Sequence, residues 1–320
     1  MIVTVTLNPV LDHTLTVPRI VFNEMMRATA SRLDWGGKGF NVSRALHSLG
    51  VEGVAMGFVG GAAGQVLERG LSDMGIATDF VRIAGETRTS MVVTDAAMER
   101  YIKVNEAGPT VRAEELAVFL DRVRERVCPG DIWVLSGSLP PSVPSDLYAQ
   151  LITLVQAQGA KPFLDTSGKP LELGCAAGPY LVKPNVVEAE EVTGRKVDSN
   201  ANMLNAVEFF LRQGIELIAL SLGADGLLLA SKRQAVWARP PRVRVRNPVG
   251  AGDALLAGIT WAVQRGLPLE ETARLGVATG TAAAMREGVS VGTRAEVEAL
   301  YEQIRVEERK IRPEGEYREQ

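Results

Sequence analysis

Short runs of β-branched and other apolar residues alternate along the chain with longer segments whose apolar residues recur at helical spacing. This alternation is typical of a parallel sheet with helices on both faces. The predicted core strands span residues 2–7, 53–59, 131–135, 161–164, 180–182, 217–220 and 226–230. The predicted helices span residues 39–49, 62–74, 113–127, 144–158, 202–212, 251–265 and 270–285. The pattern therefore predicts a single α/β domain over residues 1–320.

Four short segments depart from this rhythm because polar and apolar residues alternate within them. They span residues 13–17, 25–33, 89–95 and 101–104, and they are too polar for the centre of a parallel sheet. We expect a small separate sheet, formed within residues 12–33 and 88–104, that closes over a site as a lid, pairs with its copy in a dimer, or does both. Residues 305–320 are mostly charged and predict an exposed C-terminal tail.

Composition narrows the classes of function. The net charge is −3 and the pI is about 5.7, so no basic surface favours a nucleic-acid partner. Only Cys128 and Cys175, far apart, and two histidines occur, which favours a reducing compartment and excludes a disulfide framework or zinc site. No apolar run approaches the ~20 residues needed to span a bilayer. We therefore expect a cytoplasmic protein with no membrane partner.

The most informative motif is NPVGAGDALLAG, residues 247–258, where an extended run meets an apolar helical stretch. The amides of Gly250, Ala251 and Gly252 would be free at the helix start, where small residues let an anion approach the backbone. Asp253 would then face that anion and could take a proton from a hydroxyl that attacks a phosphate. The alternative is an ordinary aspartate in the first turn of a helix after a glycine-rich turn.

A second glycine-rich element, WGGKGFNVSRAL, spans residues 35–46. Gly36 and Gly37 precede a predicted helix, and Lys38 and Asn41 supply donors for a polar ligand. The spacing is not that of a P-loop or of a dinucleotide fingerprint, which also argues against a dehydrogenase. The alternative is a strand-to-helix turn whose lysine points to solvent.

Together, these two elements resemble the signatures of ribokinase-like sugar kinases, the phosphofructokinase B family. Seven further strings are similar, in order, to motifs of the branch that phosphorylates ketohexose phosphates. They are TLNPVLDHT (6–14), GETRTS (85–90), NEAGP (105–109), SGSLPPSVP (136–144), LDTSG (164–168), VKPNVVE (182–188) and SLGADG (221–226). The resemblance implies a ribokinase-like three-layer sandwich with a mainly parallel central sheet and a small β-sheet lid.

The resemblance also implies roles for particular residues. Asp253 would be the catalytic base, with the amides of Gly250, Ala251 and Gly252 stabilising the transferred phosphoryl group. The proposed sugar and sugar-phosphate residues are Asp12, Arg27, Gly36, Gly37, Lys38, Asn41, Arg88, Lys103 and Ser138. The proposed ATP residues are Lys183, Asn185, Ser221, Gly223 and Gly226, and Glu188 would hold magnesium. Asn185 and Glu188 also have the spacing of a helix-capping pair, Asp12 could be a turn residue, and Arg27 could be a solvated edge residue.

The expected reaction is phosphoryl transfer from ATP, with magnesium, to carbon 6 of fructose 1-phosphate. NEAGP and GAGD resemble the fructose-1-phosphate branch, whereas Asn247-Pro248 resembles the branch that uses tagatose 6-phosphate, so the latter sugar is the alternative substrate. A regulator that binds sugar phosphate without catalysis is the alternative of another class, but such a protein should have lost part of this residue set. The resemblance further implies a homodimer through the lid.

Overall fold

The computed structural model describes residues 1–98, 100–288 and 290–310. Within these residues, ten strands form one sheet in the order β14-β13-β12-β11-β10-β9-β8-β1-β4-β5. The strands from β11 to β5 run parallel, and β12, β13 and β14 add to that edge antiparallel. Their bounds are β1 (Ile2–Thr6), β4 (Val54–Val59), β5 (Ala77–Arg82), β8 (Ile132–Ser136), β9 (Lys161–Asp165), β10 (Leu181–Val182), β11 (Leu217–Ser221), β12 (Leu227–Ala230), β13 (Ala235–Arg239) and β14 (Arg305–Arg309).

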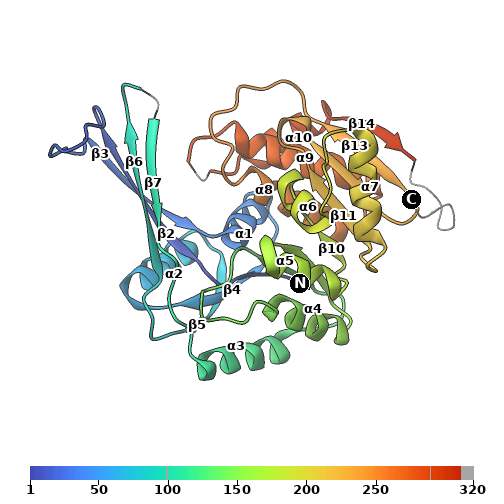
Figure 1. Cartoon of the computed structure of the whole chain (residues 1–320), viewed down its shortest axis with the longest axis horizontal. Helices are drawn as coiled ribbons and strands as arrows, with labels where there is room; N and C mark the ends of the chain where they lie inside the picture. The colour runs from blue at the N-terminus through green and yellow to red at the C-terminus, as the bar shows by residue number, and fades with distance from the viewer. Residues whose placement is uncertain (99, 289, 311–320) are drawn as a thin grey trace.

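Helices cover both faces of this sheet, as the alternating pattern predicts. Alternate residues of β1 point to opposite faces, so Val3 and Val5 pack with α3, α4 and α7, whereas Ile2 packs with α1, α8 and α9. The helices are α1 (Lys38–Ser48), α2 (Gly61–Asp73), α3 (Ala113–Arg126), α4 (Leu147–Ala157), α5 (Gly168–Ala176), α6 (Val186–Thr193), α7 (Asn200–Leu211), α8 (Ala251–Gln264), α9 (Leu269–Ala284) and α10 (Arg294–Tyr301). This three-layer α/β arrangement confirms the predicted fold class (Figure 1). None of the described helices is long and apolar enough to cross a membrane.

A separate four-stranded sheet projects from the main body beside α1 and α2 (Figure 1). Its order is β3-β2-β6-β7, with bounds β2 (Val10–Val17), β3 (Ala30–Gly36), β6 (Arg88–Asp95) and β7 (Arg100–Asn105). We call this the lid sheet. The segment 25–29, predicted as strand, has no regular secondary structure, so β3 begins only at Ala30.

The prediction of a C-terminal tail is wrong in conformation for residues 305–309, although Arg305, Glu307 and Glu308 are exposed as predicted. Residues 305–309 form β14, an edge strand that pairs antiparallel with all of β13, with Val306 opposite Ala238. Edge strands can be highly charged because one of their sides faces solvent, so charge alone did not reveal this strand. Residues 311–320 of that prediction lie outside the described residues.

Candidate active site

The polar residues singled out in the sequence meet where the parallel strands end. Asp165 ends β9 and Lys183 follows β10, while α1 and α8 begin at the same edge with Lys38 and Ala251. Ligands of open α/β sheets bind at this carboxyl edge, because loops and helix starts converge there. The candidate site therefore lies between the two glycine-rich helix starts.

Asp253 lies in the first turn of α8 with 7% of its surface exposed. The helix follows Gly250, whose φ of 82° is left-handed and favours glycine. The Nδ2 atom of Asn41, on α1, donates to Oδ2 of Asp253 at 2.6 Å. Burial raises the pKa of Asp253 to about 6. The negative charge of Asp165 also raises this pKa, whereas Lys38, Lys183 and the hydrogen bond from Asn41 lower it. Asp253 is thus a buried carboxylate that titrates just below neutral pH.

Asp165 is fully buried between two lysines. Lys38 Nζ donates to its Oδ1 at 2.8 Å, and Lys183 Nζ lies 3.2 Å from its Oδ2. Burial opposes the charge on Asp165, but Lys183 and Lys38 together hold the pKa of this carboxyl below its usual value. Lys38, predicted among the sugar-binding residues, joins the helix start at the first glycine-rich element to the end of β9. The alternative in which it points to solvent without a partner is wrong.

Asp12 lies on β2 of the lid sheet, directly across from Asp34 of β3. Its Oδ1 is buried without a hydrogen bond from the described residues, although Lys103 Nζ of β7 lies 3.7 Å away. A side chain at Gly36 would lie 2.5 Å from Oδ2 of Asp12, so glycine is required for this close approach. An unsatisfied buried carboxylate oxygen is suited to accept a hydrogen bond from a ligand hydroxyl.

Arg88 begins β6, where it pairs with Val10 of β2. Its guanidinium donates to the carbonyl oxygen of Asn8 at 3.1 and 3.3 Å and to that of Glu106 at 3.2 Å. Burial lowers the pKa of Arg88, whereas the negative charges of Asp12 and Glu106 raise it. Asn8 Nδ2 in turn lies 3.3 Å from the hydroxyl of Ser138, which brings Ser138 to the same place. Arg27 lies apart from this group, on the exposed connection before β3.

Asn185 and Glu188 form a capping box at the start of α6. Asn185 Oδ1 accepts from the amide of Glu188, and Glu188 Oε2 accepts from the amide of Asn185, both at 2.9 Å. The second carboxylate oxygen, Oε1, stays outside this box, 4.0 Å from Lys38 Nζ. The capping alternative for this pair is therefore confirmed, while one carboxylate oxygen still faces the site.

The described residues contain no group of three or more histidine, cysteine, aspartate or glutamate side chains placed to hold a metal ion. Magnesium in kinases is held by one or two carboxylates, water and substrate phosphates, and seldom by a cage of protein ligands. The single available oxygen of Glu188 fits that mode of binding.

The second glycine turn follows β11. Ser221 donates to the carbonyl of Pro184, Gly223 begins a single 3-10 turn (Gly223–Asp225), and Gly226 has a φ of 90°. A side chain at Gly226 would lie 2.1 Å from the carbonyl oxygen of Ala238 on β13. Gly226 is therefore required for packing on β13, in addition to any approach of a phosphate.

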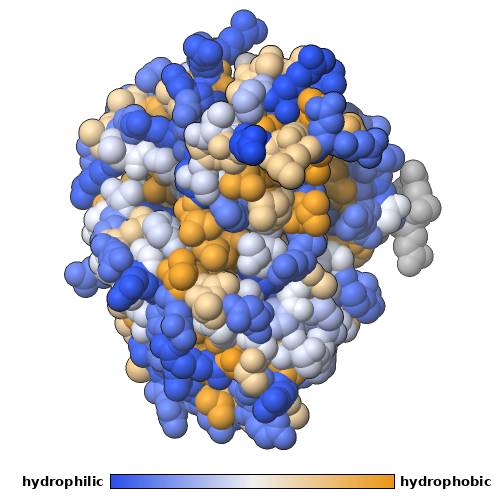
Figure 2. Space-filling model, turned by 90° about the vertical axis from the view of Figure 1, so that its left-hand side faces the viewer, coloured by the Kyte–Doolittle hydropathy of each residue, from blue (hydrophilic) through white to orange (hydrophobic). Residues whose placement is uncertain are grey.

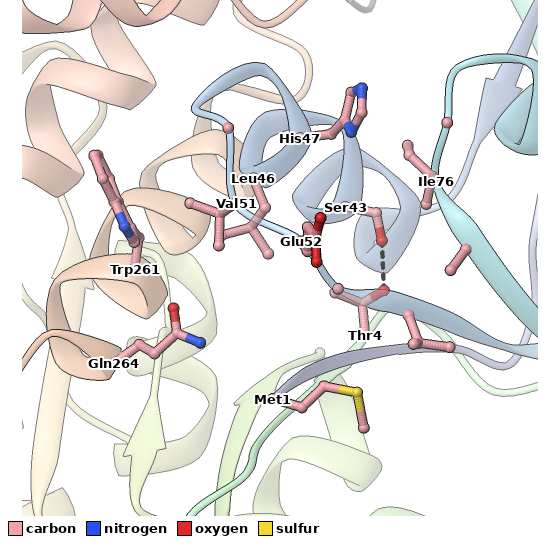
Figure 3. A pocket seen from close by; sticks show the side chains of 15 residues that line it. Met1, Thr4, Ser43, Leu46, His47, Val51, Glu52, Ile76, Trp261 and Gln264 are labelled. Atoms are coloured by element: carbon pink, nitrogen blue, oxygen red, sulfur yellow. Dashed lines mark hydrogen bonds between the residues drawn. The ribbon is translucent and has the colours of Figure 1, made fainter.

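A groove of about 780 Å³ lies at the other end of the strands, where β1, β4 and β5 begin (Figure 3). Met1, His47, Glu52 and Trp261 are among its lining residues, and Thr4 and Ser43 share a hydrogen bond of 2.5 Å in its wall. None of the residues predicted for the site lines this groove. It is distinct from the candidate site, because it lies where the strands begin.

Two polar residues of the site were not predicted from the sequence. Asp165 lies in the LDTSG string, and its place at a strand end was a usable signal. Arg44 is 3% exposed on α1, one turn after Asn41, and donates to Asn41 Oδ1. Nothing in the sequence distinguishes it from an arginine on an exposed helix face.

Comparison with known proteins agrees with this geometry. The model of the pfkB family of carbohydrate kinases matches residues 5–295. The chain is 34% identical to a 1-phosphofructokinase of Bacillus subtilis over 96% of this chain and 99% of the relative. It is 32% identical to a tagatose-6-phosphate kinase of Staphylococcus epidermidis, again over 96% and 99%. The structure superposes on phosphofructokinase-2 from Escherichia coli with a TM-score of 0.90, 31% identity and coverage of 94% and 98%.

A family model that covers most of the chain, together with relatives that match almost the full length, defines a carbohydrate kinase. The chain belongs to the pfkB family of carbohydrate kinases.

Proposed function

We propose that the chain transfers the terminal phosphoryl group of ATP to the carbon 6 hydroxyl of fructose 1-phosphate, giving fructose 1,6-bisphosphate and ADP. The observation that carries this proposal is Asp253, a buried carboxylate in the first turn of a helix that begins at a left-handed glycine. Because its pKa is about 6, it is ionised at neutral pH and still basic enough to accept a proton.

In the proposed reaction, the substrate hydroxyl hydrogen-bonds to Asp253, which takes its proton as the oxygen attacks the phosphorus. At the start of α8, the amides of Gly250 and Gly252 stabilise the charge on the transferred group, whereas the amide of Ala251, which was predicted to be free, donates to the carbonyl of Pro248 at 3.2 Å. Lys183 lies close to this helix start, with Nζ 3.7 Å from the point that a side chain at Gly252 would occupy. It adds positive charge beside the phosphates, and Asn185, Ser221, Gly223 and Gly226 line the remainder of the ATP side.

Magnesium is proposed as the metal, held through water by Glu188 Oε1. When bound, it would neutralise phosphate charge. Assays with excess chelator are therefore expected to show no turnover.

The sugar phosphate is proposed to lie under the lid sheet. Asp12, Gly36, Gly37 and Asn41 bind its hydroxyls, the first through the buried oxygen that has no hydrogen-bond donor. Its phosphate binds to the forked donors of Arg88 and to the hydroxyl of Ser138, with Lys38, Lys103 and Arg27 adding positive charge.

Two observations favour fructose 1-phosphate over tagatose 6-phosphate. Asn105 of NEAGP lies on the face of the lid sheet that carries Asp12, because Ser90 pairs with both residues, and its Oδ1 accepts from the hydroxyl of Ser90 at 2.7 Å. Asn247, which resembles the tagatose branch, instead links the loop before α8 to the segment after α9, since its side chain donates to the carbonyl of Gly288 and accepts from the amide of Val249. The segment that resembles the fructose branch thus lies nearer the proposed substrate.

A panel of substrates with ATP and magnesium tests this assignment. We expect kcat/KM to be at least about tenfold higher for fructose 1-phosphate than for tagatose 6-phosphate, fructose 6-phosphate or unphosphorylated fructose, because a sugar whose phosphate or hydroxyls do not match the site leaves buried polar groups unpaired. Fructose 6-phosphate is included because a structure of the Escherichia coli relative is described with it. A preference for tagatose 6-phosphate would overturn the substrate, and tight binding without any turnover would favour a regulator.

A homodimer through the lid sheet is also proposed. One face of the sheet carries Asp12 and Ser90, while Leu33, Met91 and Val104 form a row on the other face, since His13 pairs with both Leu33 and Met91 and Met91 pairs with Val104. These three apolar side chains are 45%, 37% and 60% exposed. Apolar side chains gather in the middle of the molecular face on this side of the protein (Figure 2).

We expect Met91→Asp to shift the protein from dimer to monomer in size-exclusion chromatography with light scattering, because a buried unpaired charge opposes association. Val66→Asp, at an exposed residue of α2, is the control and should leave the dimer intact. A wild-type protein that is monomeric at micromolar concentration would contradict the proposal, whereas a tetramer, as described for an inhibited form of the Escherichia coli relative, would require a second interface.

A further inference from the structure

Arg44 occupies an unusual position for an arginine on a helix of a soluble fold. It is 3% exposed, it lies one turn after Asn41 on α1, and its Nη2 donates to Asn41 Oδ1. Its Nε atom is buried without a hydrogen-bond acceptor among the described residues. Burying a cation this deeply is costly, so its retention calls for a specific interaction.

The guanidinium fixes which way the Asn41 amide points. An arginine side chain has only donors, so the amide atom that faces it must be the oxygen. The nitrogen of the same amide then points toward Asp253, where Nδ2 lies 2.6 Å from Oδ2. Arg44, Asn41 and Asp253 form a chain in which each hydrogen bond has one possible direction.

Arg44 keeps its charge in this environment. Burial lowers the pKa of Arg44 to about 10. The negative charges of Asp34 on β3, Asp253 on α8 and Asp12 on β2 act in the opposite direction and raise this pKa. The side chain is therefore protonated at neutral pH. Asp253 also faces Asp165 of β9, Lys38 of α1 and Lys183 after β10, so the amide of Asn41 is one of several groups that set its ionisation.

We propose that Arg44 is a positioning residue for the base, holding the Asn41 amide so that its N–H donates to Oδ2 of Asp253. Donation to Oδ2 stabilises the ionised carboxylate and leaves Oδ1 for the substrate hydroxyl. In the opposite orientation, the amide oxygen would face the carboxylate, and two acceptors in contact favour a protonated Asp253, which is no base. This inference rests on the proposed role of Asp253.

The test compares Arg44→Met, which removes the donor, with Arg44→Lys, which keeps a group that can only donate. Arg32→Met is the matched control, because Arg32 on β3 bonds to Asp34 at 2.7 Å, one of the carboxylates that face Arg44, but is exposed and does not contact Asn41. For each protein, kcat/KM for fructose 1-phosphate is measured from pH 5 to 8, with thermal melting as a check of folding. Ionisation of the substrate affects all proteins equally and cancels in the comparison.

We expect kcat/KM of Arg44→Met at pH 7 to fall by about tenfold to about a hundredfold, the value of a hydrogen bond to a charged group. The acid limb of its pH profile, where kcat/KM falls as the pH drops, should move to higher pH by about one unit. The reason is that Asp253 loses a donor that favours its ionised form. Arg44→Lys should restore most of both quantities, and Arg32→Met should change neither.

Lower stability of Arg44→Met with an unchanged acid limb and unchanged kcat/KM would overturn the proposal, since Arg44 would then serve packing alone. An equal shift of the acid limb in Arg32→Met would also overturn it, because the effect would be one of general charge. If Arg44→Met does not fold, Arg44→Gln provides the same test, since an amide can accept as well as donate. If Asp253→Asn keeps wild-type turnover, the proposed base is wrong. If Asp253→Asn is inactive but Arg44→Met is unaffected, only the proposed role of Arg44 is wrong.

Discussion

Asp253→Asn is expected to fold normally and to lower kcat by about a thousandfold, because an amide cannot take the proton of the attacking hydroxyl. The two side chains have nearly the same shape, and the Asn41 amide can still donate to the new side-chain oxygen. The KM values for sugar phosphate and ATP should change little, since the variant keeps the glycine-rich helix start and the sugar-side residues. Single-turnover measurements of phosphoryl transfer would separate this effect from product release.

The same substitution is expected to leave stability equal or slightly higher at pH 7. The pKa of Asp253 is raised in the folded state, from an ordinary value near 3.8 to about 6. A carboxyl whose folded pKa is raised destabilises the fold wherever it is ionised in both states, which here means above about pH 6. Asparagine removes that cost, so Tm should not fall.

The pH dependence of the wild type follows from the same pKa. Because the base must be ionised, kcat/KM should fall as the pH drops through about 6. A folded Asp253→Asn protein with near wild-type turnover would assign proton removal to another group, and an acid limb centred near pH 4 would show that the free enzyme does not raise this pKa.

The alternation of strands and helices predicted the central sheet because buried parallel strands leave a strong apolar signal. Some elements were missed although they carry a signal, such as the buried apolar run of β13 and the capping box of α10, whereas α5 and β14 lack one. In α5, Pro170 and two glycines within nine residues resemble a loop, yet proline is tolerated in the first turn of a helix. In β14, only Val306 is apolar among the first three residues, and pairing with β13 decides the conformation.

The candidate site could be predicted only as far as each residue carried its own local signal. Asp253 and Asn41 lie in glycine-rich strings, and Glu188 follows Asn185 at capping distance. The partners of these residues come from distant parts of the chain, as Lys38 and Asp165 show at a separation of 127 residues. Arg44 could not be recognised, since only the tertiary structure shows that the guanidinium is buried and which way the Asn41 amide points.

The second large effect is expected at Asp165. Asp165→Asn should lower the free energy of unfolding at pH 7 by about 3–5 kcal/mol, the usual cost of removing one partner from a buried ion pair. The substitution keeps the shape of the side chain but leaves two ammonium groups without their shared carboxylate, and Lys183 is only 4% exposed. Urea unfolding followed by circular dichroism measures the loss.

Asp79→Asn provides the matched control. Asp79 on β5 also bridges two cations, since Arg122 lies 3.0 Å from Oδ1 and Arg126 2.5 Å from Oδ2, but these groups are partly exposed and far from the site. Solvent weakens such pairs, so the expected loss is about 1 kcal/mol or less, with turnover unchanged. An equal loss in both variants would mean that burial does not strengthen the Asp165 interactions.

The pH profile of Asp165→Asn separates its electrostatic effect from simple loss of structure. The negative charge of Asp165 raises the pKa of Asp253, so its removal should move the acid limb of kcat/KM to lower pH. Arg44→Met is expected to move the same limb in the opposite direction. The pKa of Asp165 itself is lowered in the fold, so its stabilising contribution is complete at pH 7 and is lost only as the pH falls through that lowered value. An acid limb of Asp165→Asn that stays in place, in a protein that remains folded, would show that Asp165 does not influence the base.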